Sequence, residues 1–250
     1  MSNVTIQEEY SLPSKGLIYG KSFDPMVKLR SMTVAEEMKR LTATDYPYRN
    51  MSEIIDDCIV NKLPISAYDM CLGDYQYLLH KLRVVTYGPD YKLSIVCPIC
   101  GELFDYTQNL DELAVHVYDE SLNDVMFVEL PTSDHTIGLK FQTPRDLDRI
   151  ENKKREMKKQ FPDMKYDPTL LLNLESFIDT IDGQPVNPAT LQAFVESLPM
   201  RDVNILLQKA QKLNEKVGIE TVITAHCPSC DNDVVAPFRF SYEFFRPEVD

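Results

Sequence analysis

Two Cys-Pro-x-Cys pairs constrain the fold of this chain more than any other feature. Cys97 and Cys100 form the first pair, and Cys227 and Cys230 form the second. Two intervening residues allow both thiolates of a pair to face one ion, so each pair supplies half of a tetrahedral zinc site. We therefore predict that the four cysteines together bind one Zn²⁺. Because four sulfur ligands leave no position open for water or substrate, this zinc would be structural and not catalytic.

The residues around each pair predict a β-hairpin with the cysteines at its turn. Segments rich in β-branched and aromatic residues flank both pairs, at 91–96, 103–107, 220–225 and 234–240. Gly101 and Asp231 follow the second cysteine of each pair, where the chain must leave the turn with an unusual backbone angle. Gly adopts such an angle freely and Asp tolerates it. Two such strand–turn–strand units that share one ion would form a zinc ribbon.

Other roles for the cysteines remain open at this stage. Disulfide bonds would need an oxidising compartment, and the N-terminal residues lack the basic and apolar regions of a signal peptide. A redox Cys-x-x-Cys usually begins a helix, whereas a strand is predicted after each pair. His226 could serve as a ligand, although it should point to the opposite strand face from Cys227. Cys58 and Cys71 lie on apolar helical stripes and are predicted to be buried.

The rest of the chain predicts more helix than strand. Thr33 and Glu36 form a capping box, and Thr143 precedes a proline at the first position of a helix. Residues 1–30 are predicted to be extended, and strands are predicted within 115–141. Apolar spacing and capping residues predict helices at 33–41, 52–63, 66–87, 143–161, 168–181, 188–198 and 201–217.

The shared ion would also decide the domain organisation. The 126 residues from Gly101 to His226 would leave the ribbon and return to it, which makes them an inserted domain. We predict an α+β, mostly helical fold in which the zinc ribbon clamps this insertion and joins it to an N-terminal region of strands and helices. The predicted parts are an extended segment at 1–30, a helical region at 31–88, the two ribbon halves at 89–114 and 220–246, and the insertion at 115–219.

The charge of the chain disfavours nucleic acid as a partner. There are 26 Lys+Arg and 39 Asp+Glu, which gives a net charge of -13 and repels a phosphate backbone. One local exception is a basic cluster near the end of the predicted helix at 143–161. It is either a solvated face or a docking surface for an acidic partner. The basic cluster consists of Lys153, Lys154, Arg155, Lys158 and Lys159.

Motifs of catalysis and of membrane insertion are missing from the sequence. It has no phosphate loop, dinucleotide fingerprint, nucleophile elbow or His-Glu-x-x-His motif, and its four histidines are widely dispersed. No apolar stretch is long enough to span a bilayer. We therefore expect neither enzymatic activity nor a small-molecule substrate, and no membrane segment.

Five short segments form an ordered series in the first 110 residues. The series begins at Leu12, Pro13, Ser14, Lys15 and Gly16 and continues through 32–37, 73–74, 83–88 and the first cysteine pair at 97–101. These segments resemble T4-like bacteriophage baseplate hub proteins, and the likeness is best over the first 110 residues.

The resemblance implies a role in the tail of a contractile phage. The chain would be a component of the baseplate hub or a factor that helps the hub assemble, and its partners would be other baseplate and hub proteins. It would be found in the virion tail baseplate or in the host cytoplasm during assembly. The family carries no catalytic residues, and the Leu12–Gly16 run would be a docking element or simply a turn.

Two other functions compete with this hypothesis. The cysteine pairs and the basic cluster would also suit a zinc-ribbon regulator that binds nucleic acid. A zinc-dependent hydrolase would need a nitrogen or carboxylate ligand and an open coordination position, which four cysteines do not provide.

Overall fold

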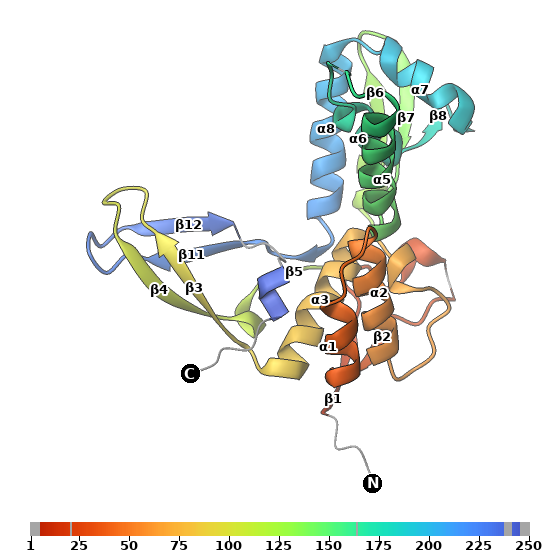
Figure 1. Cartoon of the computed structure of the whole chain (residues 1–250). Helices are drawn as coiled ribbons and strands as arrows, with labels where there is room; N and C mark the ends of the chain where they lie inside the picture. Colours follow the sequence, from red (N-terminus) through yellow and green to blue (C-terminus); the bar gives the residue numbers. More distant parts are fainter. Residues whose placement is uncertain (1–5, 21, 164, 238–241, 246–250) are drawn as a thin grey trace.

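Three parts of the chain meet at one junction in the computed structural model, which describes residues 6–20, 22–163, 165–237 and 242–245 (Figure 1). The N-terminal strands and helices form the lower part in this view, the insertion forms the upper part, and two β-hairpins project to the left. Helices and strands both contribute, as the α+β prediction expected. None of the described helices combines the length and the apolarity needed to cross a bilayer.

The N-terminal part packs short helices against a two-stranded sheet. Strands β1 and β2 pair antiparallel, and Val27 and Leu29 of β2 are fully buried against Ile55 and Leu82 in one apolar cluster. Helix α3 ends at Tyr87, as predicted, and Gly88 follows it with a φ of 90°. The elements are β1 (Gln7–Ser11), η1 (Leu17–Tyr19), β2 (Met26–Arg30), α1 (Val34–Arg40), α2 (Pro47–Cys58), η2 (Ala67–Asp69) and α3 (Leu72–Tyr87).

Two predicted helices in this part have different bounds in the structure. Helix α2 covers Pro47–Cys58 and not 52–63, because Pro47 starts the helix and Ile59 forms a β-bridge with Leu29 of β2. Helix α3 begins at Leu72 and not at 66. Residues 67–69 form the separate 3₁₀ turn η2, and Met70 and Cys71 are extended, with the backbone N–H of Cys71 donating to the Tyr19 hydroxyl at 2.9 Å. In both cases a contact with a distant segment replaces helical hydrogen bonds.

The two β-hairpins lie beside each other and are called the hairpin arm below. Strand β3 (Asp90–Val96) pairs with β4 (Leu103–Asn109), and β11 (Val222–His226) pairs with β12 (Asp233–Pro237). These pairings confirm the predicted hairpins; residues 238–240 of the last predicted strand lie outside the described part of the chain. Short 3₁₀ turns follow the hairpins at η3 (Leu110–Glu112) and η4 (Tyr242–Phe245).

The insertion builds its core between a four-stranded antiparallel sheet, in the order β6-β7-β8-β9, and three helices. Ile137, Leu174 and Leu206 are buried at its centre. Its elements are β5 (Val115–His116), α4 (Leu122–Val125), β6 (Phe127–Leu130), β7 (His135–Leu139), α5 (Pro144–Gln160), α6 (Thr169–Phe177), β8 (Ile178–Ile181), β9 (Gln184–Pro185), α7 (Pro188–Ser197), α8 (Met200–Glu215) and β10 (Gly218–Ile219).

The predicted helix at 168–181 is wrong over its last four residues. Helix α6 ends at Phe177, and Ile178–Ile181 form strand β8, which pairs with β7 so that Ile181 lies opposite Ile137. The four residues include two isoleucines and one threonine, which favour strands. Strand β7 offers them a free edge, and a short turn then leads to β9.

The insertion rejoins the N-terminal part through a very close backbone contact. A Cβ atom added to Gly73 of α3 would lie 2.0 Å from the carbonyl oxygen of Val217, which immediately precedes β10. Only glycine therefore allows α3 to pass the end of α8 at this distance. Strand β10 pairs with β5, so both ends of the insertion meet at this point.

Candidate metal centre

The turns of the hairpin arm bring the four predicted ligands together. Cys97 and Cys100 come from the turn between β3 and β4, and Cys227 and Cys230 come from the turn between β11 and β12. All four sulfur atoms lie within 4.8 Å of one another. Two of the distances join the hairpins, at 3.6 Å from Cys97 to Cys230 and 3.7 Å from Cys100 to Cys227. The predicted convergence of two distant cysteine pairs is confirmed.

These distances suit a shared metal ion. Four sulfurs placed tetrahedrally at about 2.3 Å from one ion are separated by about 3.8 Å, close to the distances from Cys97 to Cys230 and from Cys100 to Cys227. A disulfide bond needs a sulfur–sulfur distance of about 2.05 Å, and all six cysteines of the chain are free thiols. The four cysteines can therefore hold a metal ion, and the disulfide alternative does not describe this structure.

The two turns have the same backbone geometry. The N–H of Gly101 donates to the carbonyl of Cys97 at 2.9 Å, and the N–H of Asp231 donates to the carbonyl of Cys227 at 3.0 Å. Gly101 has a φ of 76° and Asp231 a φ of 59°, as predicted for residues that leave the turn in a left-handed conformation. Each hairpin therefore presents its two thiols in the same way.

Backbone amides of the first turn stabilise a thiolate. The N–H groups of Cys100 and Ile99 point at the Cys97 sulfur and lower the pKa of that thiol to about 6. A lowered thiol pKa favours the anion, which is the form that binds a metal. The turn thus favours the thiolate form of Cys97.

His226 lies outside the group of sulfurs. Its ring nitrogens pair with Asp231 at 2.7 Å and Asp233 at 3.2 Å on the exposed side of the second hairpin. These two carboxylates raise the pKa of His226 by hydrogen bonding to its ring. The alternative in which His226 is a metal ligand is therefore not supported by the geometry.

The remaining two cysteines are core residues, as predicted. Cys58 belongs to the apolar cluster of the N-terminal part and Cys71 to the apolar cluster of the insertion, and both are buried. Burial raises the pKa of the Cys58 thiol to about 12 and also raises that of Cys71. Neither thiol is a reactive nucleophile in this environment.

The Leu12–Gly16 run is a turn anchored inside the protein. Asp74 of α3 accepts hydrogen bonds from the backbone N–H of Ser14 at 2.9 Å and from the Tyr19 hydroxyl at 2.7 Å. The carbonyl of Pro13 accepts from the N–H of Tyr118 in the insertion at 2.8 Å. Leu12, Pro13, Ser14 and Gly16 are buried, so of the predicted docking residues in this run a partner reaches only Lys15. The run joins the N-terminal part to the insertion.

A family comparison agrees with these features. The model of a family described as T4 bacteriophage base plate protein matches residues 4–246. The chain belongs to this family. The match includes both hairpins and the insertion, so it extends well beyond the N-terminal segments that show the resemblance in the sequence. No curated protein and no solved structure matches the chain.

The basic cluster of this baseplate protein is partly neutralised by its own neighbours. On α5, Lys153 pairs with Glu175 at 3.4 Å, and Lys154 pairs with Glu151 at 3.1 Å. Arg155 pairs with Asp45 of the N-terminal part. Lys158 and Lys159 are exposed and have no ion-pair partner among the described residues. Only these two lysines are therefore available to an acidic partner without breaking an ion pair.

Helix α1 buries charged side chains and exposes apolar ones, which is the reverse of the usual pattern. The sequence did not reveal this orientation. Its charged residues Glu36 and Arg40 are only 6% and 5% exposed. Its apolar residues Val34, Met38 and Leu41, called the α1 stripe below, are 77%, 67% and 56% exposed. Their spacing of four and three residues indicates one helix face, but an apolar face is normally expected to face the core.

Hydrogen bonds explain how α1 can bury charge. Arg30 of β2 donates to Glu36 at 2.7 Å, and Glu36 also accepts from the N–H of Thr33 in the predicted capping box. These bonds lower the pKa of Glu36 to about 2, with the bond from Arg30 contributing most. The buried carboxylate is therefore paired, and the opposite, apolar face of the helix remains in water.

Proposed function

We propose that this chain is a non-enzymatic component of the phage baseplate hub, or a factor that helps the hub assemble, and that it acts through contacts with other baseplate and hub proteins. The observation that carries the proposal is the family match over residues 4–246. Among the described residues, the one group of three or more neighbouring metal-binding side chains is the four-cysteine cluster. Four sulfur ligands leave no open position for a substrate, which supports a structural role.

The ion in this cluster is proposed to be one structural Zn²⁺. Four thiolates in tetrahedral arrangement suit zinc, and the ion would complete a zinc ribbon that holds both ends of the insertion. Metal analysis should find one zinc per chain, and X-ray absorption should find four sulfur neighbours. A nitrogen or oxygen neighbour, or a metal-free protein with an intact hairpin arm, would overturn this assignment.

The α1 stripe supports contact with another baseplate protein. Three large apolar side chains exposed on one helix face are unfavourable in water and would be stabilised by burial. A stable interface buries about 800 Å² on each partner, far more than three side chains provide. A partner of this stripe must therefore also cover the neighbouring surface, and the family match favours another baseplate protein as that partner.

Replacing the α1 stripe tests this contact. Val34→Ser together with Met38→Ser should change the free energy of unfolding by no more than about 0.5 kcal/mol, because both positions are exposed. The same variant should lose retention of other baseplate proteins in pull-downs from infected cells. Val60→Ser, at another exposed apolar position, is the matched control and should keep it. Equal retention by both variants would remove the α1 stripe from the interface.

Recovery from phage and from infected cells tests the function itself. Mass spectrometry of purified virions should detect the chain if it is a structural subunit. Its presence only with assembling baseplates would indicate an assembly factor. If tagged protein recovered no tail or baseplate protein from infected cells, the proposal would fail.

The nucleic-acid alternative has weaker support. Three of the five residues of the basic cluster are paired with acidic residues, which leaves Lys158 and Lys159. Binding to DNA or RNA that weakens steeply with added salt would revive that alternative, since each neutralised phosphate contributes to the slope.

A further inference from the structure

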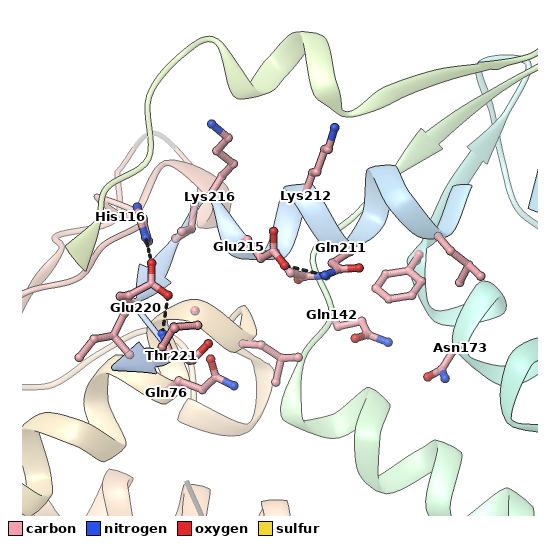
Figure 2. Close-up of a pocket in the computed structure, with 18 residues that line it drawn as sticks. Gln76, His116, Gln142, Asn173, Gln211, Lys212, Glu215, Lys216, Glu220 and Thr221 are labelled. Carbon is pink, nitrogen blue, oxygen red and sulfur yellow. Dashed lines mark hydrogen bonds and ion pairs between the residues drawn. The ribbon is translucent and has the colours of Figure 1, made fainter. Parts of the chain in front are cut away.

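A hollow of about 990 Å³ lies where the insertion meets the N-terminal part. Figure 2 shows α8 along one side of the hollow and α3 with the neighbouring segment around Thr221 along another. Residues of α6 and the segment before α5 complete the wall. Ligand sites in proteins usually have volumes of about 300 to 1,000 Å³, so this hollow is large enough for several residues of a peptide.

Half-buried apolar side chains line part of the wall. Leu72, Phe177 and Leu207 come from α3, α6 and α8, and each is accessible from the hollow while packing against the protein on its other side. Such surfaces accept apolar side chains of a ligand, because burial of both surfaces releases water. The hollow therefore offers hydrophobic contact contributed by three separate helices.

Two side-chain amides in the wall have unused hydrogen-bonding capacity. Gln76 of α3 and Asn173 of α6 line the hollow, and Figure 2 shows them on different sides of it. Both residues are half-buried, and neither side-chain amide has a hydrogen-bond partner among the described residues. An amide side chain both donates and accepts, so it matches the N–H and C=O groups of a polypeptide main chain.

The charged residues of the wall are paired or turned away. Glu215 accepts from Gln211 at 2.7 Å, and Glu220 accepts from the N–H of Thr221 at 3.0 Å and pairs with His116 at 3.1 Å. Figure 2 shows the side chains of Lys212 and Lys216 pointing away from the hollow. Glu220 is thus neutralised by a neighbour, and the ammonium groups of both lysines point away from the amides of Gln76 and Asn173.

We propose that this hollow binds an extended, largely uncharged polypeptide segment of another baseplate protein. Gln76 and Asn173 hydrogen-bond to its main chain, and Leu72, Phe177 and Leu207 contact its apolar side chains. The proposal rests on the proposed function, because it takes the partner to be a baseplate protein. It adds a defined site and a chemical class of ligand that differ from the exposed α1 stripe.

Synthetic peptides provide the test. Overlapping peptides that tile the other baseplate proteins of the same phage, and this chain itself, would be titrated against the intact, metal-loaded protein by fluorescence anisotropy. We expect at least one peptide from another baseplate protein to bind. Gln76→Leu combined with Asn173→Leu should weaken the affinity for that peptide by about tenfold, since two hydrogen bonds are lost. Gln208→Leu, at an exposed position of α8 outside the hollow, is the matched control and should bind normally.

Three results would overturn the proposal: no peptide binds, binding survives the double variant, or only peptides of this chain itself bind. Gln76→Ala with Asn173→Ala repeats the test should the leucine variant fold poorly. Co-purification of the wild-type chain with baseplate proteins is measured in parallel. If co-purification persists while peptide binding fails, the assignment of the hollow as a peptide site is wrong and the proposed function stands. If co-purification is absent, the proposed function fails independently.

Discussion

The hairpin arm and the insertion are stabilised in different ways. The insertion surrounds a continuous apolar cluster in which residues such as Ile137, Leu206 and Leu213 are almost completely buried. The hairpin arm buries apolar residues on one face only, and Val96 and Leu103 on its other face are 60% and 62% exposed. An isolated two-stranded sheet of this kind is only marginally stable in water. One face of the arm packs into the apolar cluster of the N-terminal part. The difference predicts that burial is sufficient for the insertion, whereas the hairpin arm also needs an ion held by its four cysteines.

Replacement of two of the proposed metal ligands should give the largest effect, and that effect should be confined to the hairpin arm. Cys97→Ser with Cys227→Ser removes one ligand from each hairpin, and a structural zinc contributes on the order of 10 kcal/mol to folding. In hydrogen exchange, amides of β3, β4, β11 and β12 should lose protection while those of α8 keep it. Cys58→Ala is the control that retains the metal. A metal-free double variant with a protected hairpin arm would contradict the comparison.

A cavity in the insertion should produce the second largest effect and leave the metal in place. Leu206→Ala removes a side chain that is 1% exposed, and such truncations cost about 2 to 5 kcal/mol. Urea unfolding measures the loss, and metal analysis should show unchanged zinc. Leu170→Ala, at an exposed position of α6, should cost little. Loss of zinc from Leu206→Ala would show that the two regions are not independent.

A buried histidine of α3, at its contact with the hairpin arm, should make the free energy of unfolding depend on pH. The Nε2–H of His80 donates to the carbonyl of Leu110, directly after the first hairpin, at 2.9 Å. Burial, with a smaller effect of Lys81, lowers the pKa of His80 to about 4. Between pH 6.5 and 4 the unfolded imidazole therefore takes up a proton that the folded one does not. The free energy of unfolding should fall by about 3 kcal/mol as the pH drops through this window.

His80→Gln isolates this contribution. Glutamine keeps a donor for the Leu110 carbonyl but does not titrate, so its unfolding free energy should decline less than that of the wild type between pH 6.5 and 4. Urea titrations at several pH values within that window provide the comparison. Parallel curves for the two proteins would show that His80 does not contribute to the pH dependence of the free energy of unfolding.

A cap in the insertion should give the smallest effect. The Thr143 hydroxyl accepts from the N–H of Asp146 at 3.2 Å at the start of α5, where Asp146 completes the capping box. Thr143→Ala should cost about 1 kcal/mol, and Thr143→Ser should cost less because serine also caps. Thermal unfolding distinguishes the two. Equal losses would assign the effect to packing of the methyl group instead of the cap.

Predictions that depend on nearby residues, such as turns and caps, were confirmed. Those that depend on distant segments were incomplete, apart from the convergence of the two cysteine pairs. The turns after Cys100 and Cys230 and the caps at Thr33 and Thr143 follow from residues only a few positions away. The apolar spacing that predicted a helix through Ile178–Ile181 was misleading. These residues pair with β7, and a pattern of nearby residues cannot show that a distant strand edge is available. The basic cluster was found by composition, but its neutralisation by residues such as Asp45 was not visible.

The sequence by itself determined the two cysteine turns, the strands beside them and the ends of several helices. These features depend on backbone angles and hydrogen bonds within a few residues, so the same residue types produce them in many proteins. Only the tertiary structure decided that Asp74 holds the turn at Ser14 and that the α1 stripe faces water. These outcomes depend on which distant segments exclude water from one another, and that is a property of the whole packed chain.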